Sequence, residues 1–316
     1  ERLPGLAEVA SLDSEAFNAL NTAMFTDGAL IAVDSNVEID LPIHLVFISN
    51  ADGRPVASHP RILISAGANS RAVVLETHVG RSGAYLTNVV AEVALQPGAQ
   101  IAHYKLQRDS EAAHHVAFTA VRQANDSRYV ASALLLGGGV TRHAVSTSLA
   151  APGASCQLDG LGLGRGHQHR DLQTVVEHAV PHCSSDQLVK TVLDEAATAV
   201  FNGKVIVRQH ADGTDAIQNN RNLLLAKSAT ANTRPQLEIY ADDVKCVHGA
   251  TVGQIDENAL FYLRSRGLDA GRARALLTYS FALEVIERIE HAPIRAVMRA
   301  AASEWLNTDT VLEVTP

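Results

Sequence analysis

Cysteine is scarce in this sequence, and its placement does not suit disulfides. Cys156, Cys183 and Cys246 are odd in number and far apart in the chain, which is a poor disulfide framework and indicates a reducing compartment. No apolar run approaches the length of a membrane span, and no signal-peptide pattern opens the chain. We therefore expect a soluble, cytoplasmic protein without membrane contact. Because the sequence starts at Glu1 and not at a methionine, we also expect an N-terminal portion to be missing.

Aromatic residues and positive charge are also in short supply. Aromatics make up 4% of the 316 residues, and the formal net charge is -8 at pH 7, which argues against a nucleic-acid-binding surface. The glycine-rich segment 160–166 lacks the third glycine of a dinucleotide-binding loop, and Gly203-Lys204 is followed by Val205 where a phosphate loop needs Ser or Thr. We expect no nucleotide to be bound by this chain, and we interpret both segments as turns.

Short apolar strands fill most of the sequence. From about Leu30 to Gly253, runs such as 43–49, 85–95 and 143–149 alternate in polarity and are broken by Gly, Pro, Asn or Asp. Helix-length amphipathic stretches are missing between most of them, which excludes a doubly wound α/β sheet and leaves a sandwich, a barrel or a solenoid. A weak internal repeat favours the solenoid, because Ala66-Gly-Ala68, Pro97-Gly-Ala99 and Pro152-Gly-Ala154 each precede a new strand.

Helices are predicted only at the two ends. Residues 13–25 are typical of a short helix, capped by Asp13 or Ser14 and carrying Phe17, Leu20 and Met24 on one face. After Gly253 the spacing predicts three more helices. They cover residues 256–266, with Gly267 as the stop, a segment that follows Asp269 with an apolar stripe at 276, 279, 283 and 286, and a segment from Pro293 to about 306.

One pair of candidate metal ligands stands out near the end of the strand region. Cys246 and His248 lie two apart, so on an extended strand both point to one face. A thiolate and an imidazole together suit zinc, iron or an iron–sulfur cluster. The alternative for Cys246 is a small buried hydrophobe beside Val244, because the apolar residues at 244 and 247 favour opposite faces as the core.

Two other clusters of polar residues have weaker patterns. A histidine-rich patch is a minor candidate for a second metal site, and the favoured interpretation is a set of structural histidines hydrogen-bonded to neighbouring backbone. Asp242 and Asp243 are consecutive, so on a strand they would face opposite ways, and we expect a turn there and not a catalytic carboxylate pair. The patch consists of His167, His169, His178, His182 and Cys183.

Long runs of the sequence resemble one known family. QLEIYADDVKCVHGATVGQ at residues 236–254, followed by FYLRSRGL at 261–268, resembles the C-terminal signature of the SufB/SufD family of iron–sulfur cluster assembly proteins. AVFNGKV at 199–205 with QHA at 209–211 and QNN at 218–220 agrees with it, and the likeness extends from about Ile43 to the end. The SufB type typically has an acidic residue after the motif histidine, where this chain has Gly249, so the likeness favours the SufD type.

The resemblance implies a fold and a division of the chain. SufB and SufD proteins form a right-handed parallel β-helix, which would occupy residues 30–255. Residues 1–29 would be the remnant of an N-terminal helical region, and residues 256–316 a C-terminal helical region.

The resemblance also implies a function without enzymatic activity. This chain would be a scaffold subunit that pairs with a SufB-type paralogue, binds a SufC-type ATPase through its C-terminal helices, and holds a transient iron–sulfur cluster with Cys246 and His248 at the interface with a partner. When the chain is alone, a homodimer is a possible form, and the sequence does not reveal whether it occurs. The alternatives are a purely structural heterodimer partner without a metal role, or a carbohydrate-active β-helix enzyme, for which carboxylates two apart on a strand and a secretion signal are lacking.

Overall fold

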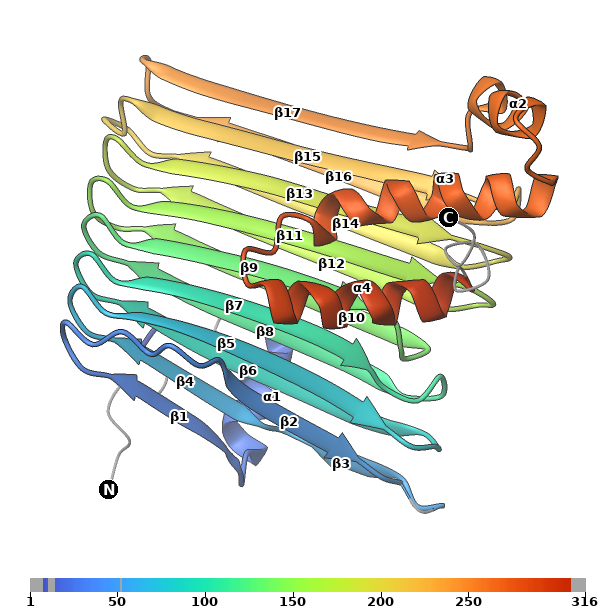
Figure 1. Cartoon of the computed structure of the whole chain (residues 1–316). Coiled ribbons are helices and arrows are strands. Elements are labelled where there is room, and N and C mark those ends of the chain that lie inside the picture. Colours follow the sequence, from blue (N-terminus) through green and yellow to red (C-terminus); the bar gives the residue numbers. More distant parts are fainter. Residues whose placement is uncertain (1–7, 11–14, 52, 308–316) are drawn as a thin grey trace.

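Two parallel sheets face each other along the whole molecule and form a solenoid (Figure 1). The structure is a computed structural model that describes residues 8–10, 15–51 and 53–307. The chain passes from one sheet to the other and back, so that each strand pairs in parallel with the strand one coil earlier. This arrangement confirms the parallel β-helix.

The strands of the two sheets alternate along the sequence. The first sheet has the order β1 (Gly28–Val33), β4 (Arg61–Ala66), β6 (Tyr85–Leu95), β8 (His114–Gln123), β10 (Val140–Leu149), β12 (His169–His178), β14 (Thr198–Val207) and β16 (Thr230–Ile239), with β3 (Val56–Ser58) also pairing with β6. The second sheet has the order β2 (Ile43–Ser49), β5 (Arg71–Gly80), β7 (Gln100–Arg108), β9 (Arg128–Leu135), β11 (Ser155–Gly164), β13 (Ser184–Leu193), β15 (Thr214–Leu224) and β17 (Val244–Gly253).

One corner of the solenoid is built from left-handed residues. Seven residues with positive φ follow one another roughly 30 residues apart, and most lie just before a strand of the second sheet. The corners are hydrogen-bonded from coil to coil, for example from Asn69 N to Pro97 O at 2.9 Å and from Asp126 N to Pro152 O at 3.1 Å. Gly adopts this conformation freely, while Asn, Asp and His adopt it at modest cost. The seven residues are Asn36, Asn69, Gly98, Asp126, Gly153, His182 and Gly213.

The glycine-rich segment 160–166 is mostly strand, so our interpretation of it as a turn was wrong. Gly160, Gly162 and Gly164 lie in β11 and face the interior. A Cβ at Gly162 or Gly164 would lie 3.6 Å from the side chain of Arg170, which is fully buried and donates to the carbonyl oxygens of residues 136, 138 and 163, each at 2.9 Å. A Cβ would be in ordinary contact with Arg170, whereas it would lie closer to Leu172 (3.3 Å from Gly162) and Leu193 (3.2 Å from Gly164), so the glycines make room mainly for these leucines. Gly203 and Lys204 also lie inside a strand, β14.

The N-terminal helix α1 (Ala16–Met24) is present, but its apolar stripe faces outward. Phe17, Leu20 and Met24 are exposed, whereas Asn18 and Asn21 are buried. Asn21 donates to Pro60 O at 3.0 Å and to Asn88 O at 2.8 Å, so the helix packs on the first sheet through hydrogen bonds. The predicted caps Asp13 and Ser14 lie outside the described residues.

Three helices follow the last strand, as predicted. They are α2 (Glu257–Ser265), α3 (Ala270–Ile286) and α4 (Ala292–Leu306). Asp256 and Asp269 cap the first two through their side chains, Gly267 ends α2 with φ 97°, and Pro293 lies in the first turn of α4. No helix in the described part of the chain combines the length and the apolar character needed to span a bilayer.

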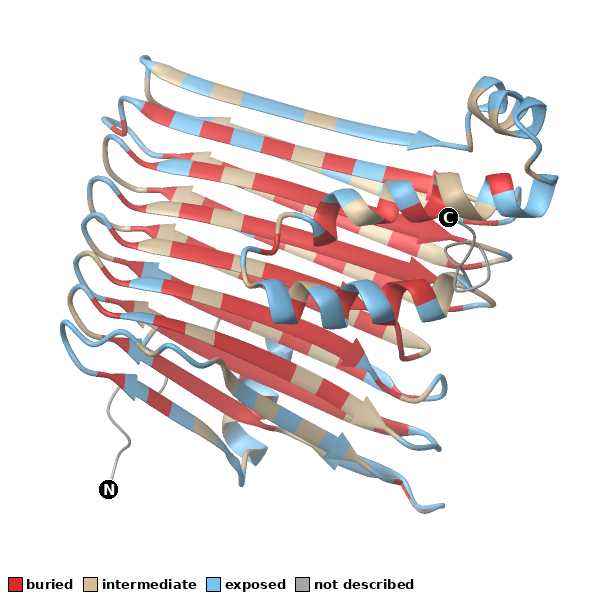
Figure 2. Cartoon of the chain, in the orientation of Figure 1, coloured by how far each residue is buried: buried red, intermediate tan, exposed pale blue. Residues whose placement is uncertain are grey.

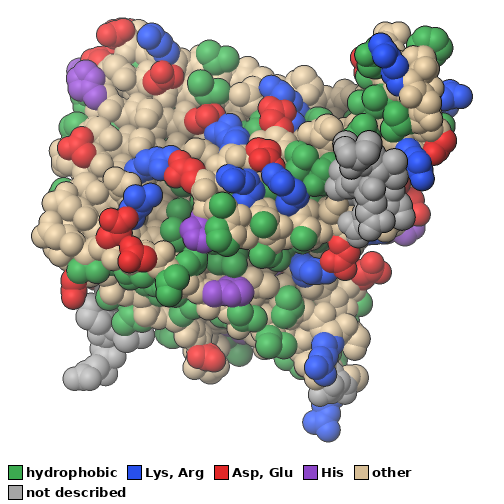
Figure 3. Space-filling view, in the orientation of Figure 1, with side chains coloured by type: hydrophobic (Ala, Val, Ile, Leu, Met, Phe, Trp, Pro, Cys, Tyr) green, Lys and Arg blue, Asp and Glu red, His purple; other side chains and the backbone are tan. Residues whose placement is uncertain are grey.

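Helices α3 and α4 cover the outer face of the second sheet (Figure 1). Their buried residues, among them Ile286, Ile294 and Met298, pack against Leu106 and Leu161 of the sheet in one apolar cluster. Each fully buried aliphatic side chain in such a cluster contributes about 1.5–3 kcal/mol. Ion pairs lie around this cluster. Figure 3 shows that acidic and basic side chains are mixed on this face of the molecule. The ion pairs include Arg128–Glu290 at 2.6 Å and Arg288–Asp186 at 2.7 Å.

Candidate functional site

The two predicted ligands lie on the last strand of the solenoid. Within the described residues, β17 pairs only with β15, so its other edge has no strand beside it. Figure 2 shows the contrast between this mostly exposed strand and the buried strands below it. Cys246 is aligned with Ala216 of β15, and His248 with Gln218.

The structure settles which face of β17 is the core. Val244 and Cys246 pack against an apolar cluster that contains Val205 and Ala216, whereas Val247 is 62% exposed. Burial raises the pKa of the Cys246 thiol, and the charge of Asp215 adds to this effect. The thiol is therefore protonated at neutral pH, and binding a metal would require it to release that proton.

His248 shares the inward side with Cys246 but is exposed. His248 is exposed because, within the described residues, no further coil covers the interior above β17. Gln218 lies directly below it and is fully buried, and neither its amide oxygen nor its amide nitrogen has a hydrogen-bond partner. Gly203 of the opposite sheet leaves space for this amide, since a Cβ there would lie 2.6 Å from Gln218 Nε2.

Cys246 and His248 make only half of a metal site. The part of the chain that the structure describes contains no group of three or more His, Cys, Asp or Glu side chains arranged to hold a metal ion. A cluster held permanently usually takes four protein ligands. Any cluster here would need ligands from another chain, and the open edge of β17 leaves room for one.

Comparisons with known proteins agree with the fold and with the motif around these residues. Residues 47–281 match the SufBD core domain of the SUF system for iron–sulfur cluster assembly. The chain is 34% identical over 299 residues to the iron–sulfur cluster assembly protein SufD of Escherichia coli, a match that covers 94% of this chain and 71% of that protein. The chain belongs to the SufB/SufD family.

Other members of the family are equally similar in sequence. A SufBD-family cluster assembly protein of Synechocystis is 38% identical over 92% of this chain and 66% of its own length. The chloroplastic protein ABCI7 of Arabidopsis thaliana is 34% identical over 91% of this chain and 62% of its own length. This chain thus spans about two thirds of the length of these relatives, and its closeness to SufD of Escherichia coli supports the SufD type.

The residues of the histidine-rich patch do not lie together in this SufB/SufD-family chain. His169 and His178 are the first and last residues of β12, which places them roughly 30 Å apart at the rise of a strand. His178 is buried, its Nε2 lies 2.9 Å from Ser185 Oγ, and burial lowers its pKa to about 4. His182 occupies a left-handed corner. The patch is therefore not a metal site within the described residues, and Asp242 and Asp243 lie in the predicted turn.

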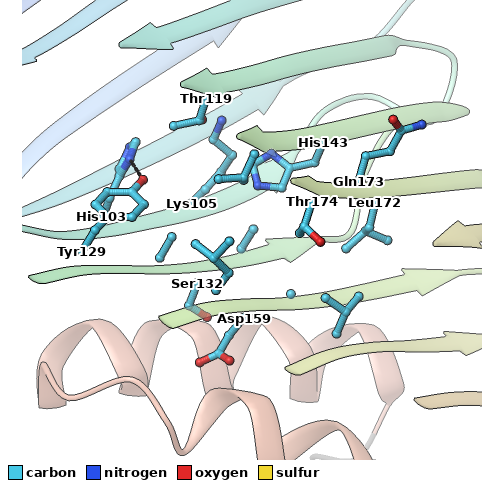
Figure 4. Close-up of a pocket in the computed structure, with 16 residues that line it drawn as sticks. His103, Lys105, Thr119, Tyr129, Ser132, His143, Asp159, Leu172, Gln173 and Thr174 are labelled. Atoms are coloured by element: carbon cyan, nitrogen blue, oxygen red, sulfur yellow. Dashed lines mark hydrogen bonds between the residues drawn. The ribbon is translucent and has the colours of Figure 1, made fainter. Parts of the chain in front are cut away.

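A second polar region, which the sequence did not reveal, lies inside the first coils, and Figure 4 shows two of its residues, His103 and Lys105. Glu76 of β5 is fully buried and is surrounded by His78 Nε2 at 3.0 Å, His103 Nε2 at 2.5 Å and Lys105 Nζ at 3.1 Å. Burial alone would raise the pKa of Glu76, but Lys105 and His103 outweigh it and hold the pKa well below its usual value. Burial lowers the pKa of His78 to about 4, so His78 is neutral.

A second buried acid extends this cluster. Asp109 Oδ2 lies 2.9 Å from His115 Nδ1, and Asp109 also accepts hydrogen bonds from Tyr85 at 2.9 Å and Gln107 at 2.8 Å. Burial would raise its pKa, but the hydrogen bond and charge of His115 bring it to about 2. We name these seven residues the interior cluster: Glu76, His78, His103, Lys105, Gln107, Asp109 and His115.

An apolar layer separates the interior cluster from the end of the solenoid. Leu172, Val189 and Phe201 pack together with Ala133 and Leu135 across the two sheets. Gln218 and His248 lie on the far side of this layer in the order of the strands. Apolar side chains thus separate the interior cluster from Gln218 and His248.

Proposed function

We propose that this chain acts as a SufD-type scaffold subunit in iron–sulfur cluster assembly, with Cys246 and His248 as ligands of a transient cluster at the interface with a partner. The observation that carries the proposal is the placement of both residues on one side of an unpaired last strand, inside the motif that the family shares. The exposure of His248 makes it the stronger candidate. Cys246 is partly covered and protonated, so it would bind only after losing a proton.

The last strands of the two sheets, β16 and β17, differ, and the difference supports β17 as the strand that pairs with a partner. An unpaired strand exposes backbone groups that can pair with another chain. β16, which ends the first sheet, contains Pro235 and therefore lacks one backbone N–H. β17 has no proline over its ten residues and exposes Val247 and Val252. We propose that a SufB-type paralogue pairs here, and that a second copy of this chain takes its place when the chain is alone.

A cluster with few and mixed ligands suits temporary holding. One thiolate and one imidazole from this chain would leave coordination positions to be filled by the partner. Such a cluster is the cargo of the complex and not a resident cofactor. Because we expect no nucleotide to be bound by this chain, we assign ATP hydrolysis to a SufC-type partner.

The C-terminal helices offer a narrower contact for the ATPase than their apolar stripe suggested. The apolar faces of α3 and α4 are already packed on the second sheet. Phe261 and Tyr262 of α2 are 72% and 56% exposed, and α2 extends away from the sheet (Figure 1). We propose that the SufC-type ATPase contacts α2.

The test of the cluster role is reconstitution of the complete complex under anaerobic conditions. The His248→Ala variant is expected to assemble with SufB-type and SufC-type proteins, as judged by size-exclusion chromatography, but to bind less iron and acid-labile sulfide. Cys246→Ser is expected to have a smaller effect. His114→Ala serves as the matched control, because His114 is also exposed but lies in the middle of the first sheet.

One outcome would favour the second candidate function. If the double variant His248→Ala/Cys246→Ser assembles and holds as much iron and sulfide as the wild type, the chain is a structural partner without a metal role.

The α2 contact is tested by capture of the purified ATPase on the immobilised chain. Phe261→Ala/Tyr262→Ala is expected to weaken capture at least tenfold, since truncated aromatic anchors often cost 2 kcal/mol or more. Val297→Ala is the control, because Val297 is an exposed apolar residue of α4. Unchanged capture by the α2 variant would place the contact elsewhere.

A further inference from the structure

A small cavity lies inside the solenoid beside the interior cluster (Figure 4). Its volume is about 30 Å³. It exists because side chains shrink from one coil to the next. Lys105 of β7 is aligned with Ala133 of β9, which is aligned with Gly160 of β11. Ala133 and Gly160 both line the cavity, and Leu172 closes its Gly160 side, since a Cβ at Gly160 would lie 2.9 Å from Leu172 Cδ2.

Four buried polar groups from four different strands line this cavity without a hydrogen-bond partner. They are Lys105 Nζ of β7, His143 Nδ1 of β10, Asp159 Oδ1 of β11 and Thr174 Oγ1 of β12. Their residues are 3%, 9%, 6% and 6% exposed. Lys105 Nζ lies 3.1 Å from Glu76 Oε2, but that ion pair leaves donors of the ammonium group unused. Buried polar groups without partners are rare in folded proteins and carry their full desolvation cost.

We propose that the cavity is a binding site for a guest of one or two non-hydrogen atoms that accepts a hydrogen bond from Lys105 Nζ, namely water or a halide-sized anion. The volume exceeds the roughly 10–15 Å³ that one water needs, and the site offers the two to four polar partners that buried waters usually have. The remaining walls are mixed, with apolar side chains such as Val145 and Leu158 and polar ones such as Ser132. Nucleotides, sugars and iron–sulfur clusters are all too large for this space.

The groups around the cavity fit such a guest. Lys105 Nζ forms an ion pair with Glu76 at 3.1 Å but makes no hydrogen bond, so its N–H groups are available to a second acceptor. Burial and the nearby charge of Lys105 lower the pKa of His143 well below its usual value. His143 is therefore neutral, and its ring can either donate to or accept from the guest, as can the hydroxyl of Thr174. The inference does not depend on the proposed function.

Crystals grown in sodium chloride and then soaked in sodium bromide distinguish the two guests. Density with at least two hydrogen bonds to Lys105, His143 or Thr174 and no anomalous signal at the bromine edge identifies water. An anomalous peak in the cavity identifies an anion. A cavity without density in both crystals overturns the proposal.

Stability measurements give an independent test with a matched control. Thr174→Val removes the hydroxyl that would bind the guest, so the unfolding equilibrium constant should rise about tenfold. Thr147→Val is the control, because Thr147 Oγ1 is also buried without a partner but lies outside the cavity, and its loss should leave stability unchanged or increase it. If both variants are equally stable, Thr174 has no guest to bind and the proposal fails.

Discussion

The interior cluster and the Cys246/His248 pair use the same strand geometry but differ in their surroundings. Glu76 and His78 are two residues apart on β5, as Cys246 and His248 are on β17. The first pair has strands on both sides and is fully buried, so its charges are matched by His103 and Lys105. The second pair lies at an edge and has no such partners within the described residues. The Cys246/His248 pair therefore stays available for a ligand because it lies where the solenoid ends.

The largest expected effect is a loss of stability when the interior cluster is changed. Glu76→Gln removes the carboxylate that compensates Lys105 and His103, and breaking a buried ion pair in this way typically costs about 3–5 kcal/mol. Glu38→Gln is the matched control, since Glu38 pairs with Arg71 at 3.4 Å with both side chains more than half exposed, and it should cost at most about 1 kcal/mol. Urea denaturation measures both. Equal losses would mean that the interior cluster is not held by charge.

The second effect is a loss of stability in acid. His78 has its pKa lowered to about 4 in the folded chain, whereas the unfolded chain takes up this proton near its usual value of about 6.5. The unfolded state therefore binds more protons, and stability should fall by up to about 3 kcal/mol as the pH drops from 6.5 to 4. Denaturation curves of wild type and His78→Gln across this range measure the contribution. If the two curves stay parallel, His78 is not neutral in the fold.

The smallest effects are expected at the end of the solenoid. Cys246→Ser places a hydroxyl against the apolar cluster around Val205 and should cost about 1 kcal/mol. His248→Ala should change the free energy of unfolding by less than about 0.5 kcal/mol, because His248 is exposed. Thermal or urea denaturation of the chain alone tests both. A large loss of stability in His248→Ala would indicate that His248 has a structural role, and the contrast between this pair and the interior cluster would not hold.

Much of the fold could be predicted because its strands and helix caps depend on local signals. Strands such as β2 and β6 begin and end where the polarity pattern predicts, and Asp256, Asp269 and Pro293 mark helix starts. The repeat was hard to see because the left-handed corner is filled by four residue types, so that a glycine pattern finds only part of it. The strand in segment 160–166 was missed because its glycines make room for side chains of other strands, such as Leu172 and Leu193, whose positions no local pattern reveals.

The candidate site was only partly predictable for the same reason. The alternation of Cys246 and His248 follows from the sequence, but whether either is exposed depends on which strand is last. The interior cluster was missed altogether, since His103 and Lys105 meet Glu76 only once the length of a coil is known. Knowing that successive coils are aligned would have brought these three residues together.

The seven left-handed corners make each coil a structural unit whose strands pair with the coils above and below it. In such a linear stack, stability is a sum over neighbouring interfaces, and each of the two terminal units has one interface where the others have two. The coil that carries Cys246 and His248 is one of these terminal units, so its opening free energy is lower than that of the coils in the middle of the stack. Backbone amides of β17 should exchange with deuterium earlier than those of β7 or β9, and the end of the protein can rearrange while the interior cluster stays closed.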